Sequence, residues 1–458
     1  MKVALVHDYI KEYGGAERVL EALCEIFPEA PIYTAFYKKD SIAYQKFKDK
    51  KIIASWVQNI PFFATKLHSP LRFLAPFIWG SFDFSDYDIV ISSASWYVTK
   101  GFGRRNSSCH PEFISGSPVR RQAYLRSREM LKQVQHDIGE KPIEICYCHT
   151  PPRWLYGYKT SVEWQKFWPI KVYGIIVGHL MRLYDFSAAQ RVDYFIANSE
   201  EVKNRIKKFY KRDAVVIYPP VSLNSKSEYR NSKSIRQAQD PEFTEGQIQN
   251  SNFQNSKKEI ASPAKLDRND GREDYYFIVS RLVGSKGLDL AVEAASKLGF
   301  KLKIAGAPAG YYTEYKRLIG KGRGSRNKFG MTSNNNVEFL GHVTDEELAV
   351  LYTKAKAFLA MSQDEDFGIT PVEAMSFGTP VIAYNGGGYK ETVIDGKTGL
   401  FFNEQSAESL INAINKFETL RQAQGKKMSE DCIKQAQKFS KEEFKRKILE
   451  FIKKVKEK

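Results

Sequence analysis

The sequence has few of the features that mark secreted, zinc-binding or membrane-spanning proteins. Its five cysteines are scattered over 458 residues, and Cys146-x-Cys148 has no second pair to complete a zinc site. The apolar run at residues 175–183 is interrupted by a histidine and an arginine and is too short to cross a bilayer. Met1 and Lys2 lead straight into an apolar stretch instead of a signal peptide. We therefore expect a cytoplasmic protein with reduced thiols, no metal site and no spanning helix.

Acidic residues are also in short supply. The 53 Asp and Glu residues stand against 70 Lys and Arg, which gives a formal net charge of +17. This balance favours anionic partners, such as a phosphorylated substrate, an anionic membrane face or nucleic acid, although a solvated basic surface also accounts for much of it. The basic residues are dispersed and no nucleic-acid-reading motif is present, so we expect no nucleic-acid partner.

The chain does contain a repeated alternation of short apolar runs with helical segments, which predicts an α/β fold with doubly wound parallel sheets. The expected strands are residues 2–7, 31–36, 52–57, 88–93, 143–148, 194–199, 214–221, 275–280, 302–305, 337–340, 357–361 and 380–384. The expected helices are residues 16–27, 200–212, 288–298, 313–319, 345–354 and 440–456. The length is sufficient for two or three domains.

Residues 361–388 combine an acidic loop, a short helix and a strand that ends in three glycines. Thr370 and Pro371 have the character of an N-cap and a first helical residue. Glu365 and Glu373, with seven residues between them, are expected to face one crevice at the carboxyl end of a strand, where open α/β sheets bind ligands. An ionised carboxylate accepts two hydrogen bonds from the vicinal hydroxyls of a sugar or ribose. Thr370-x-x-Glu373 also fits a capping box, so a purely structural role for Glu373 stays open.

Three further positions are candidates for ligand contacts. Gly14-Gly15 lies between a strand and a helix, where backbone amides approach an anionic or sugar group, although many such turns carry glycine for steric reasons alone. Arg281 and Lys286 flank a glycine-containing turn at a helix N-terminus, which has the electrostatics of a diphosphate site. His149 ends a strand and is followed by two prolines, which places it to point into a crevice.

Two segments, residues 104–140 and 224–272, break the alternation. They are rich in Ser, Asn, Gln, Lys and Arg and lack sustained periodicity. Short strings recur in them, and Arg236 to Gln239 (RQAQ) is repeated at Arg421 to Gln424. Because the copies fall in segments that we expect to be unrelated loops, a solenoid repeat is excluded. We interpret the repeated strings as derived from a mobile repetitive genetic element whose insertion is tolerated at surface turns.

The longer strings carry a family resemblance. Residues 365–368 (EDFG), 373–375 (EAM) and 378–381 (GTPV) resemble the E-x7-E signature of the retaining nucleotide-sugar glycosyltransferases of family 4, which have the GT-B fold. Residues 149–155 (HTPPRWL) resemble a mannosyltransferase-like branch of that family. The resemblance covers nearly the whole chain outside the two inserted segments.

The resemblance implies two Rossmann-like parallel-sheet domains that face each other across a cleft. Residues 1–223 would form the N-terminal acceptor domain, with an insert at about 104–140, and residues 224–272 a disordered inserted linker. Residues 273–439 would form the C-terminal nucleotide-sugar domain, and residues 440–458 a helix that crosses back to the N-terminal domain.

The resemblance also implies a reaction and its residues. The donor would be a nucleotide-diphosphate sugar, with GDP-mannose preferred and UDP-sugars as the alternative, and no metal or other cofactor would be needed. The acceptor would be a saccharide or a lipid-linked saccharide in cell-surface polysaccharide synthesis. The residues implied as catalytic are His149, which contacts the donor sugar, Glu365, which holds its hydroxyls, and Arg281 and Lys286, which hold the diphosphate. The remaining donor-binding residues are Gly14, Gly15, Phe367, Gly368, Ile369 and Glu373, the last of which holds the ribose.

Two alternatives remain at this stage. A catalytically silent nucleotide-sugar-binding protein would keep the same binding residues without turnover. Residues 61–84, rich in aromatics and carrying Lys66, His68 and Arg72, fit either an anionic membrane interface or an ordinary core segment. An anionic membrane surface is therefore a candidate partner, which would place the protein at the inner face of the cell membrane.

Overall fold

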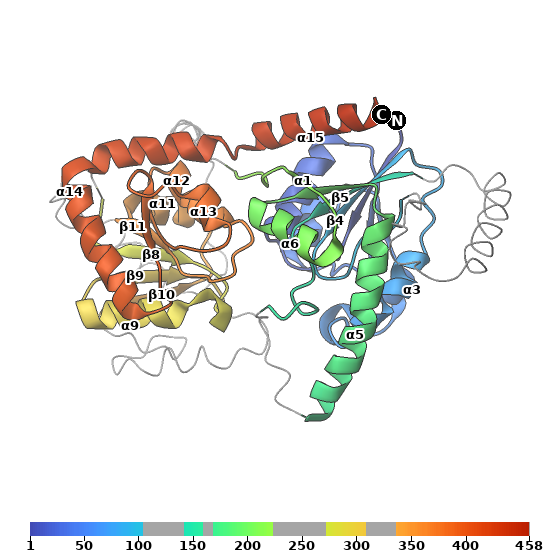
Figure 1. Ribbon diagram of the computed structural model, residues 1–458, viewed down its shortest axis with the longest axis horizontal. Helices are drawn as coiled ribbons and strands as arrows, with labels where there is room; N and C mark the ends of the chain where they lie inside the picture. The colour runs from blue at the N-terminus through green and yellow to red at the C-terminus, as the bar shows by residue number, and fades with distance from the viewer. Residues whose placement is uncertain (104–141, 159–167, 223–271, 308–335, 458) are drawn as a thin grey trace, which may run out of the picture. The chain divides into compact units, whose positions relative to one another are not determined.

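The computed structural model describes residues 1–103, 142–158, 168–222, 272–307 and 336–457 of the chain. The contacts within it define two units, one formed by residues 1–220 with 442–458 and the other by residues 221–441 (Figure 1). Within the described ranges, no helix is long and apolar enough to cross a membrane. The helix expected at residues 313–319 and nearly all of both inserted segments lie outside these ranges.

The first unit contains a fully parallel sheet in the order β3-β2-β1-β4-β5-β6-β7. Its strands are β1 (Val3–His7), β2 (Ile32–Thr34), β3 (Ile52–Ala54), β4 (Ile89–Ala94), β5 (Ile143–Cys148), β6 (Tyr194–Ala197) and β7 (Val215–Val216). Most of these strands are buried on both faces, which is why they read as continuous apolar runs in the sequence. The order reverses between β1 and β4, so the carboxyl ends of these two strands form the topological switch point.

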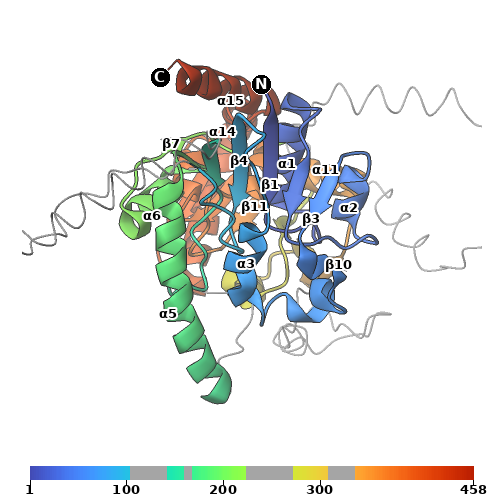
Figure 2. The same cartoon turned by 90° about the vertical axis from the view of Figure 1, so that its right-hand side faces the viewer.

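Helices cover both faces of this sheet. They are α1 (Gly15–Ile26), α2 (Ile42–Phe47), α3 (Ala75–Gly80), α5 (Trp168–Arg191), α6 (Glu200–Tyr210) and α15 (Lys441–Lys456). Residues 56–59 and 72–74 form 3-10 turns, and residues 63–67 form a π turn. Although α15 is the last helix of the chain, it packs beside α1 and its buried face belongs to the core of the first unit (Figures 1 and 2).

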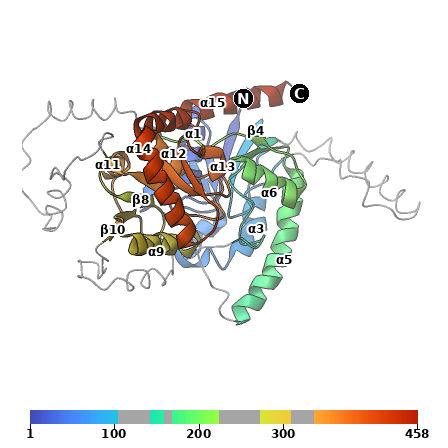
Figure 3. The same ribbon diagram turned by 60° about the vertical axis from the view of Figure 1, so that its left-hand side comes forward.

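The second unit contains a parallel sheet in the order β10-β9-β8-β11-β12-β13. Its strands are β8 (Tyr276–Val279), β9 (Leu302–Ala305), β10 (Val337–Gly341), β11 (Ala357–Ala360), β12 (Val381–Tyr384) and β13 (Gly399–Phe402). Its helices are α9 (Leu288–Leu298), α11 (Asp345–Lys354), α12 (Ile369–Ser376), α13 (Tyr389–Thr392) and α14 (Ala407–Gln437), with a 3-10 turn at Gly284–Lys286. Figure 3 shows α14 running along this unit past α12 to α9. Its switch point lies between β8 and β11.

One expectation about the second unit was wrong. The RQAQ copy at residues 421–424 does not form a loop but lies inside α14, where Arg421 is buried and Gln424 alone has non-helical angles (φ −144°, ψ 27°). Arg272, the last residue of the second inserted segment, contacts the folded unit. The Arg272 guanidinium donates hydrogen bonds to the carbonyl oxygens of Thr353 and Ala355 at 3.0 and 2.9 Å, which fixes the chain just before β8.

The attachment of α15 predicts a difference between two of its residues. Phe444 is 2% exposed and its ring contacts that of Tyr147 with 5.9 Å between centroids, whereas Leu449 on the same helix is 51% exposed. Phe444→Ala should therefore lower the free energy of unfolding of the first unit by about 3–5 kcal/mol. Leu449→Ala should change it by less than about 0.5 kcal/mol. Urea unfolding of both variants measures this, and equal losses would contradict the packing of α15 described above.

Candidate functional site

The switch point of the second unit brings two loops together. Arg281 lies just beyond β8 and is exposed, and Lys286 ends the 3-10 turn that precedes α9. Glu365 lies on the loop that follows β11, the neighbouring strand. Because β8 and β11 are parallel neighbours, both loops leave the same edge of the sheet.

A glycine holds these two loops in contact. Gly287 has a φ of +64°, and a Cβ atom built at this position would lie 2.9 Å from the carbonyl oxygen of Met361. A larger residue would therefore be strained both by its backbone conformation and by this contact. The Ser362 hydroxyl also donates to the carbonyl oxygen of Ser285 at 3.4 Å. The close approach places the end of the β8–α9 turn directly against the end of β11.

The approach pairs two of the predicted site residues. The Lys286 Nζ lies 2.6 Å from Glu365 Oε2, and the two side chains are 27% and 18% exposed. The Tyr389 hydroxyl also donates to Glu365 Oε2 at 3.4 Å. A cation and a carboxylate thus meet at the switch point, and both remain accessible to a ligand.

The helix α12 starts two residues earlier than the sequence suggested. Its N-cap is Gly368, with a φ of +87°, and not Thr370. A Cβ at residue 368 would lie 2.8 Å from the Tyr389 ring, so both conformation and space require glycine here. Phe367 is 2% exposed and packs on Phe439 with 5.4 Å between ring centroids. The aromatic ring of Phe367 is therefore a packing element, and Gly368 and Ile369 begin a helix whose first amides point toward any bound anion.

The earlier start also excludes the capping-box interpretation of Glu373. With Gly368 as the N-cap, Glu373 lies beyond the first turn, and no side-chain cap is formed. Its side chain is 7% exposed, and its Oε2 accepts a hydrogen bond from the Tyr352 hydroxyl at 3.1 Å. A nearly buried carboxylate at this place needs partners to offset its desolvation. The role of Tyr352 as one such partner had no signal in the sequence.

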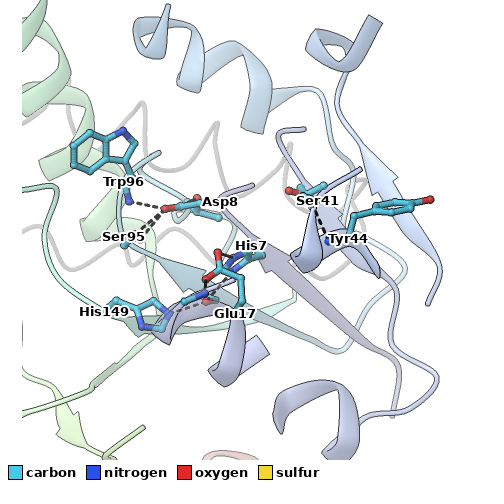
Figure 4. Close-up of polar contacts among 12 residues, drawn as sticks. His7, Asp8, Glu17, Ser41, Tyr44, Ser95, Trp96 and His149 are labelled. Atoms are coloured by element: carbon cyan, nitrogen blue, oxygen red, sulfur yellow. Dashed lines mark hydrogen bonds and ion pairs between the residues drawn. The ribbon is translucent and has the colours of Figure 1, made fainter. Parts of the chain in front are cut away.

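In the first unit, His149 follows β5 directly, and its backbone N–H donates to the carbonyl oxygen of Ala94 at 2.9 Å. The imidazole is 8% exposed, and its Nε2 lies 2.8 Å from Ser93 Oγ (Figure 4). Burial, with a smaller contribution from nearby His7, lowers the pKa of His149 to about 3. The side chain is therefore neutral near pH 7.

The β1–α1 turn supplies residues that the sequence did not single out. The Gly14 amide donates to Glu17 Oε2 at 2.9 Å, so this amide is already used to start α1. Glu17 Oε1 lies 3.4 Å from His7 Nε2, and His7 Nδ1 lies 3.0 Å from Ser93 Oγ. The sequence signal that could have indicated this cluster is the presence of polar residues, His7 and Ser93, at the carboxyl ends of the apolar strands β1 and β4.

The predicted site residues therefore form separate groups within the two units. In the second unit, Lys286 and Glu365 touch, Gly368 and Ile369 begin α12, and Glu373 contacts Tyr352. In the first unit, His149 joins a hydrogen-bonded cluster, and Gly14 and Gly15 begin α1. Within the described residues, no cluster of His, Cys, Asp and Glu has the composition of a metal site.

Parts of the chain are similar in sequence to known glycosyltransferases. A family profile described as "Glycosyl transferases group 1" matches residues 261–439. The chain is similar to the alpha-1,3/1,6-mannosyltransferase ALG2 of Dictyostelium discoideum, with 26% identity over 59% of this chain and 61% of that protein. A 76-residue stretch is 38% identical to the lipopolysaccharide core biosynthesis mannosyltransferase LpcC of Rhizobium leguminosarum, covering 17% of this chain and 21% of that protein. The chain thus spans less than two thirds of the length of these relatives.

Solved structures identify the fold. Anabaena Alr3699/HepE in complex with UDP matches 99% of this chain and 100% of its own, with a TM-score of 0.58 and 17% identity. The sucrose-phosphate synthase of Thermosynechococcus elongatus matches with a TM-score of 0.59 and 15% identity over 99% of both chains. The fold is GT-B. The expected fold class is confirmed, and the profile match supports a glycosyltransferase of the GT-B type. The family-4 and mannosyltransferase assignments stay predictions.

The low pKa of His149 has a consequence for stability. At pH values between its ordinary value of 6.5 and about 3, the unfolded chain binds a proton at residue 149 that the folded chain does not. Stability should therefore fall as the pH is lowered through this window. His149→Gln should make the dependence of the unfolding free energy on pH shallower, whereas His179→Gln, on the exposed surface of α5, should leave it unchanged. Identical slopes for the wild type and His149→Gln would contradict the assignment.

Proposed function

We propose that the protein is a retaining glycosyltransferase that moves a sugar, mannose from GDP-mannose in the preferred case, from a nucleotide-diphosphate donor to a saccharide or lipid-linked acceptor. Cell-surface polysaccharide synthesis is the proposed context. The observation that carries the proposal is the contact of Lys286 with Glu365 at the β8–β11 switch point. The similarity to two named mannosyltransferases supports mannose as the transferred sugar.

The chemistry assigned to this pair follows from its charges. A donor brings two phosphates, which attract a cation, next to a sugar ring, whose hydroxyls donate to a carboxylate. Partly exposed ion pairs contribute only about 0–1 kcal/mol to stability, so a donor can separate Lys286 from Glu365 at little cost. Arg281 and Lys286 would then stabilise the negative charge that develops on the departing diphosphate.

The other site residues take supporting roles in the proposal. Gly368 and Ile369 offer the first amides of α12 to the donor, and the backbone of Phe367 leads into them. Glu373 holds the ribose hydroxyls, and His149 contacts the donor sugar. Gly14 and Gly15 let the donor approach the β1–α1 turn through atoms other than the Gly14 amide, which already binds Glu17.

A donor screen tests the proposal. The purified protein should release GDP from GDP-mannose in the presence of an acceptor extract, and Lys286→Met should abolish most of that release. Faster release from UDP-sugars would replace the preferred donor with the alternative, which the UDP complex of the structurally similar Alr3699/HepE makes worth testing. Donor binding without any turnover would assign the protein to the silent nucleotide-sugar-binding class.

Glu373 does not cap α12, so its substitution tests the proposed ribose contact alone. Glu373→Gln removes the charge and one acceptor oxygen from the ribose contact. Charge-assisted hydrogen bonds contribute about 1.5–3 kcal/mol, so the affinity for GDP and for GDP-mannose should both fall roughly tenfold to a hundredfold. Titration calorimetry measures the two affinities. Glu338→Gln, on the exposed surface of β10, is the matched control. Unchanged affinity in Glu373→Gln would remove the ribose assignment.

We also propose an anionic membrane surface as a partner of the first unit, with α5 as the contacting helix. In residues 61–84, the expected membrane face, Phe63, Ala75, Ile78 and Trp79 belong to the core, whereas Phe62 and Phe77 are 71% and 66% exposed. The exposed apolar side chains lie mainly on α5, which extends beyond the rest of the unit in Figures 1 and 2. They are Trp168, Val172, Tyr173, Ile175, Ile176, Leu180, Leu183 and Phe186.

The charges of α5 favour an anionic lipid surface as its partner. The helix has a single acidic residue, Asp185, which is buried and paired with Lys100. Lys171 is exposed on the same helix as the apolar residues. An apolar face with interfacial aromatics and positive charge is suited to the boundary between headgroups and acyl chains.

Vesicle binding tests this surface. Binding to vesicles with anionic lipids should fall as salt is raised, because screening weakens the attraction. Ile175→Glu should weaken the binding further, whereas Leu449→Glu, at an exposed leucine of α15, should not. Equal binding to neutral vesicles, or self-association through α5 that Ile175→Glu abolishes, would refute the lipid assignment.

A further inference from the structure

A continuous chain of hydrogen bonds leads from Glu17 through His7 and Ser93 to His149 (Figure 4). The four residues come from α1, β1, β4 and the end of β5, which lie side by side in the first unit. His7 and Ser93 are register partners on adjacent strands. All four residues are buried, and the Glu17 side chain, the most exposed one at the start of the series, is 10% exposed.

The direction of hydrogen-bond donation along this series depends on Ser93, which lies in its middle. The Ser93 hydroxyl has one proton but contacts a ring nitrogen on each side, His7 Nδ1 at 3.0 Å and His149 Nε2 at 2.8 Å. It donates to one imidazole and accepts from the other. Whichever nitrogen receives the Ser93 proton must itself carry none, and the opposite nitrogen must carry one.

The contact of Glu17 with His7 determines the direction in which the hydrogen bonds are donated. An ionised carboxylate only accepts, so His7 Nε2 must carry a proton to bond with Glu17 Oε1. That contact is 3.4 Å long, well beyond the 2.7–2.9 Å typical of a bond between an imidazolium and a carboxylate. With one ring proton, His7 must carry it on Nε2 to reach Glu17 Oε1. Its Nδ1 accepts the Ser93 proton.

We infer that Glu17, acting through His7 and Ser93, holds His149 as the tautomer with its proton on Nε2. The Nδ1 of His149, which has no hydrogen-bond partner among the described residues, is then an acceptor with a free lone pair. On the proposed function, this nitrogen accepts a hydrogen bond from a hydroxyl of the donor sugar and does not donate one. His7, Ser93 and Glu17 are positioning residues that act only through His149.

The two oxygens of Glu17 allow a sharp test. Oε2 accepts from the Gly14 amide at 2.9 Å while Oε1 faces His7. In Glu17→Gln, the Gly14 amide keeps the single oxygen, so the NH2 group faces His7 Nε2 and donates to it. His7 must then move its proton to Nδ1 and donate to Ser93, and Ser93 must donate to His149 Nε2. One substitution far from His149 thus reverses its tautomer. Glutamine also suits the capping box, so α1 should still form.

Nitrogen NMR of the ligand-free protein, labelled at its seven histidines, reads the tautomer directly. The His149 signals are identified by their loss in His149→Gln. The wild type should show a protonated Nε2 and an unprotonated Nδ1, and Glu17→Gln should exchange the two. Ser93→Ala should give a mixture of tautomers, Ser93→Thr should restore the wild-type pattern, and Ser95→Ala, which removes a nearby hydroxyl outside the chain, should have no effect.

The outcomes separate this inference from the proposed function. A protonated Nδ1 in the wild type, or an unchanged tautomer in both Glu17→Gln and Ser93→Ala, would overturn the inference whether or not the protein transfers sugar. The wild-type spectrum alone is decisive if a variant fails to fold. Conversely, an absence of donor turnover with the expected tautomer would overturn only the proposed function and leave the hydrogen-bond chain intact.

Discussion

The close approach of the β8–α9 turn to the end of β11 is the constraint on which the candidate site depends. Gly287 permits it, because any side chain there would meet the carbonyl oxygen of Met361. The approach brings Lys286 within 2.6 Å of Glu365 and so places opposite charges at one switch point. A pair of this kind adds little to stability, since both groups keep contact with water. In the proposed function, the pair offers a cation for the donor phosphates and a carboxylate for the sugar hydroxyls side by side.

The first unit uses its own switch point differently. At the ends of its described strands, His149 is nearly buried and kept neutral, and its orientation is held by Ser93 from the adjacent strand. Glu17 serves two purposes there, because it starts α1 through the Gly14 amide and orients His7. The same sheet topology thus places a partly exposed ion pair in one unit and a buried hydrogen-bonded cluster in the other.

The apolar runs in the sequence predicted most of the strands, because strands buried on both faces leave a simple pattern; residues 143–148 and 302–305 match β5 and β9 end to end. The strand β13 was not expected, and the run at 214–221 forms only the two-residue β7. Helix starts were harder to place. Thr370 looked like an N-cap, but the positive φ of Gly368 and its fit against Tyr389 set the true start, and neither is visible locally. The pairing of Lys286 with Glu365, and the link from Glu17 to His149, join residues far apart in the chain. Only the register of parallel strands reveals them. We place the proposed membrane face on α5 because several apolar residues of the segment 61–84 belong to the core, and burial depends on which side of a helix meets the sheet.

The central claim is that Lys286 holds the diphosphate and Glu365 the sugar. The most direct measurement is the affinity for GDP and for GDP-mannose in Lys286→Met and Glu365→Gln, determined by titration calorimetry. The account predicts that Lys286→Met weakens both ligands alike. It predicts that Glu365→Gln weakens the binding of GDP-mannose but not that of GDP, because GDP has no sugar for Glu365 to hold. In this variant Lys286 is also no longer neutralised by a carboxylate, which favours the phosphates of GDP. Equal loss of both ligands in Glu365→Gln would contradict this division of roles.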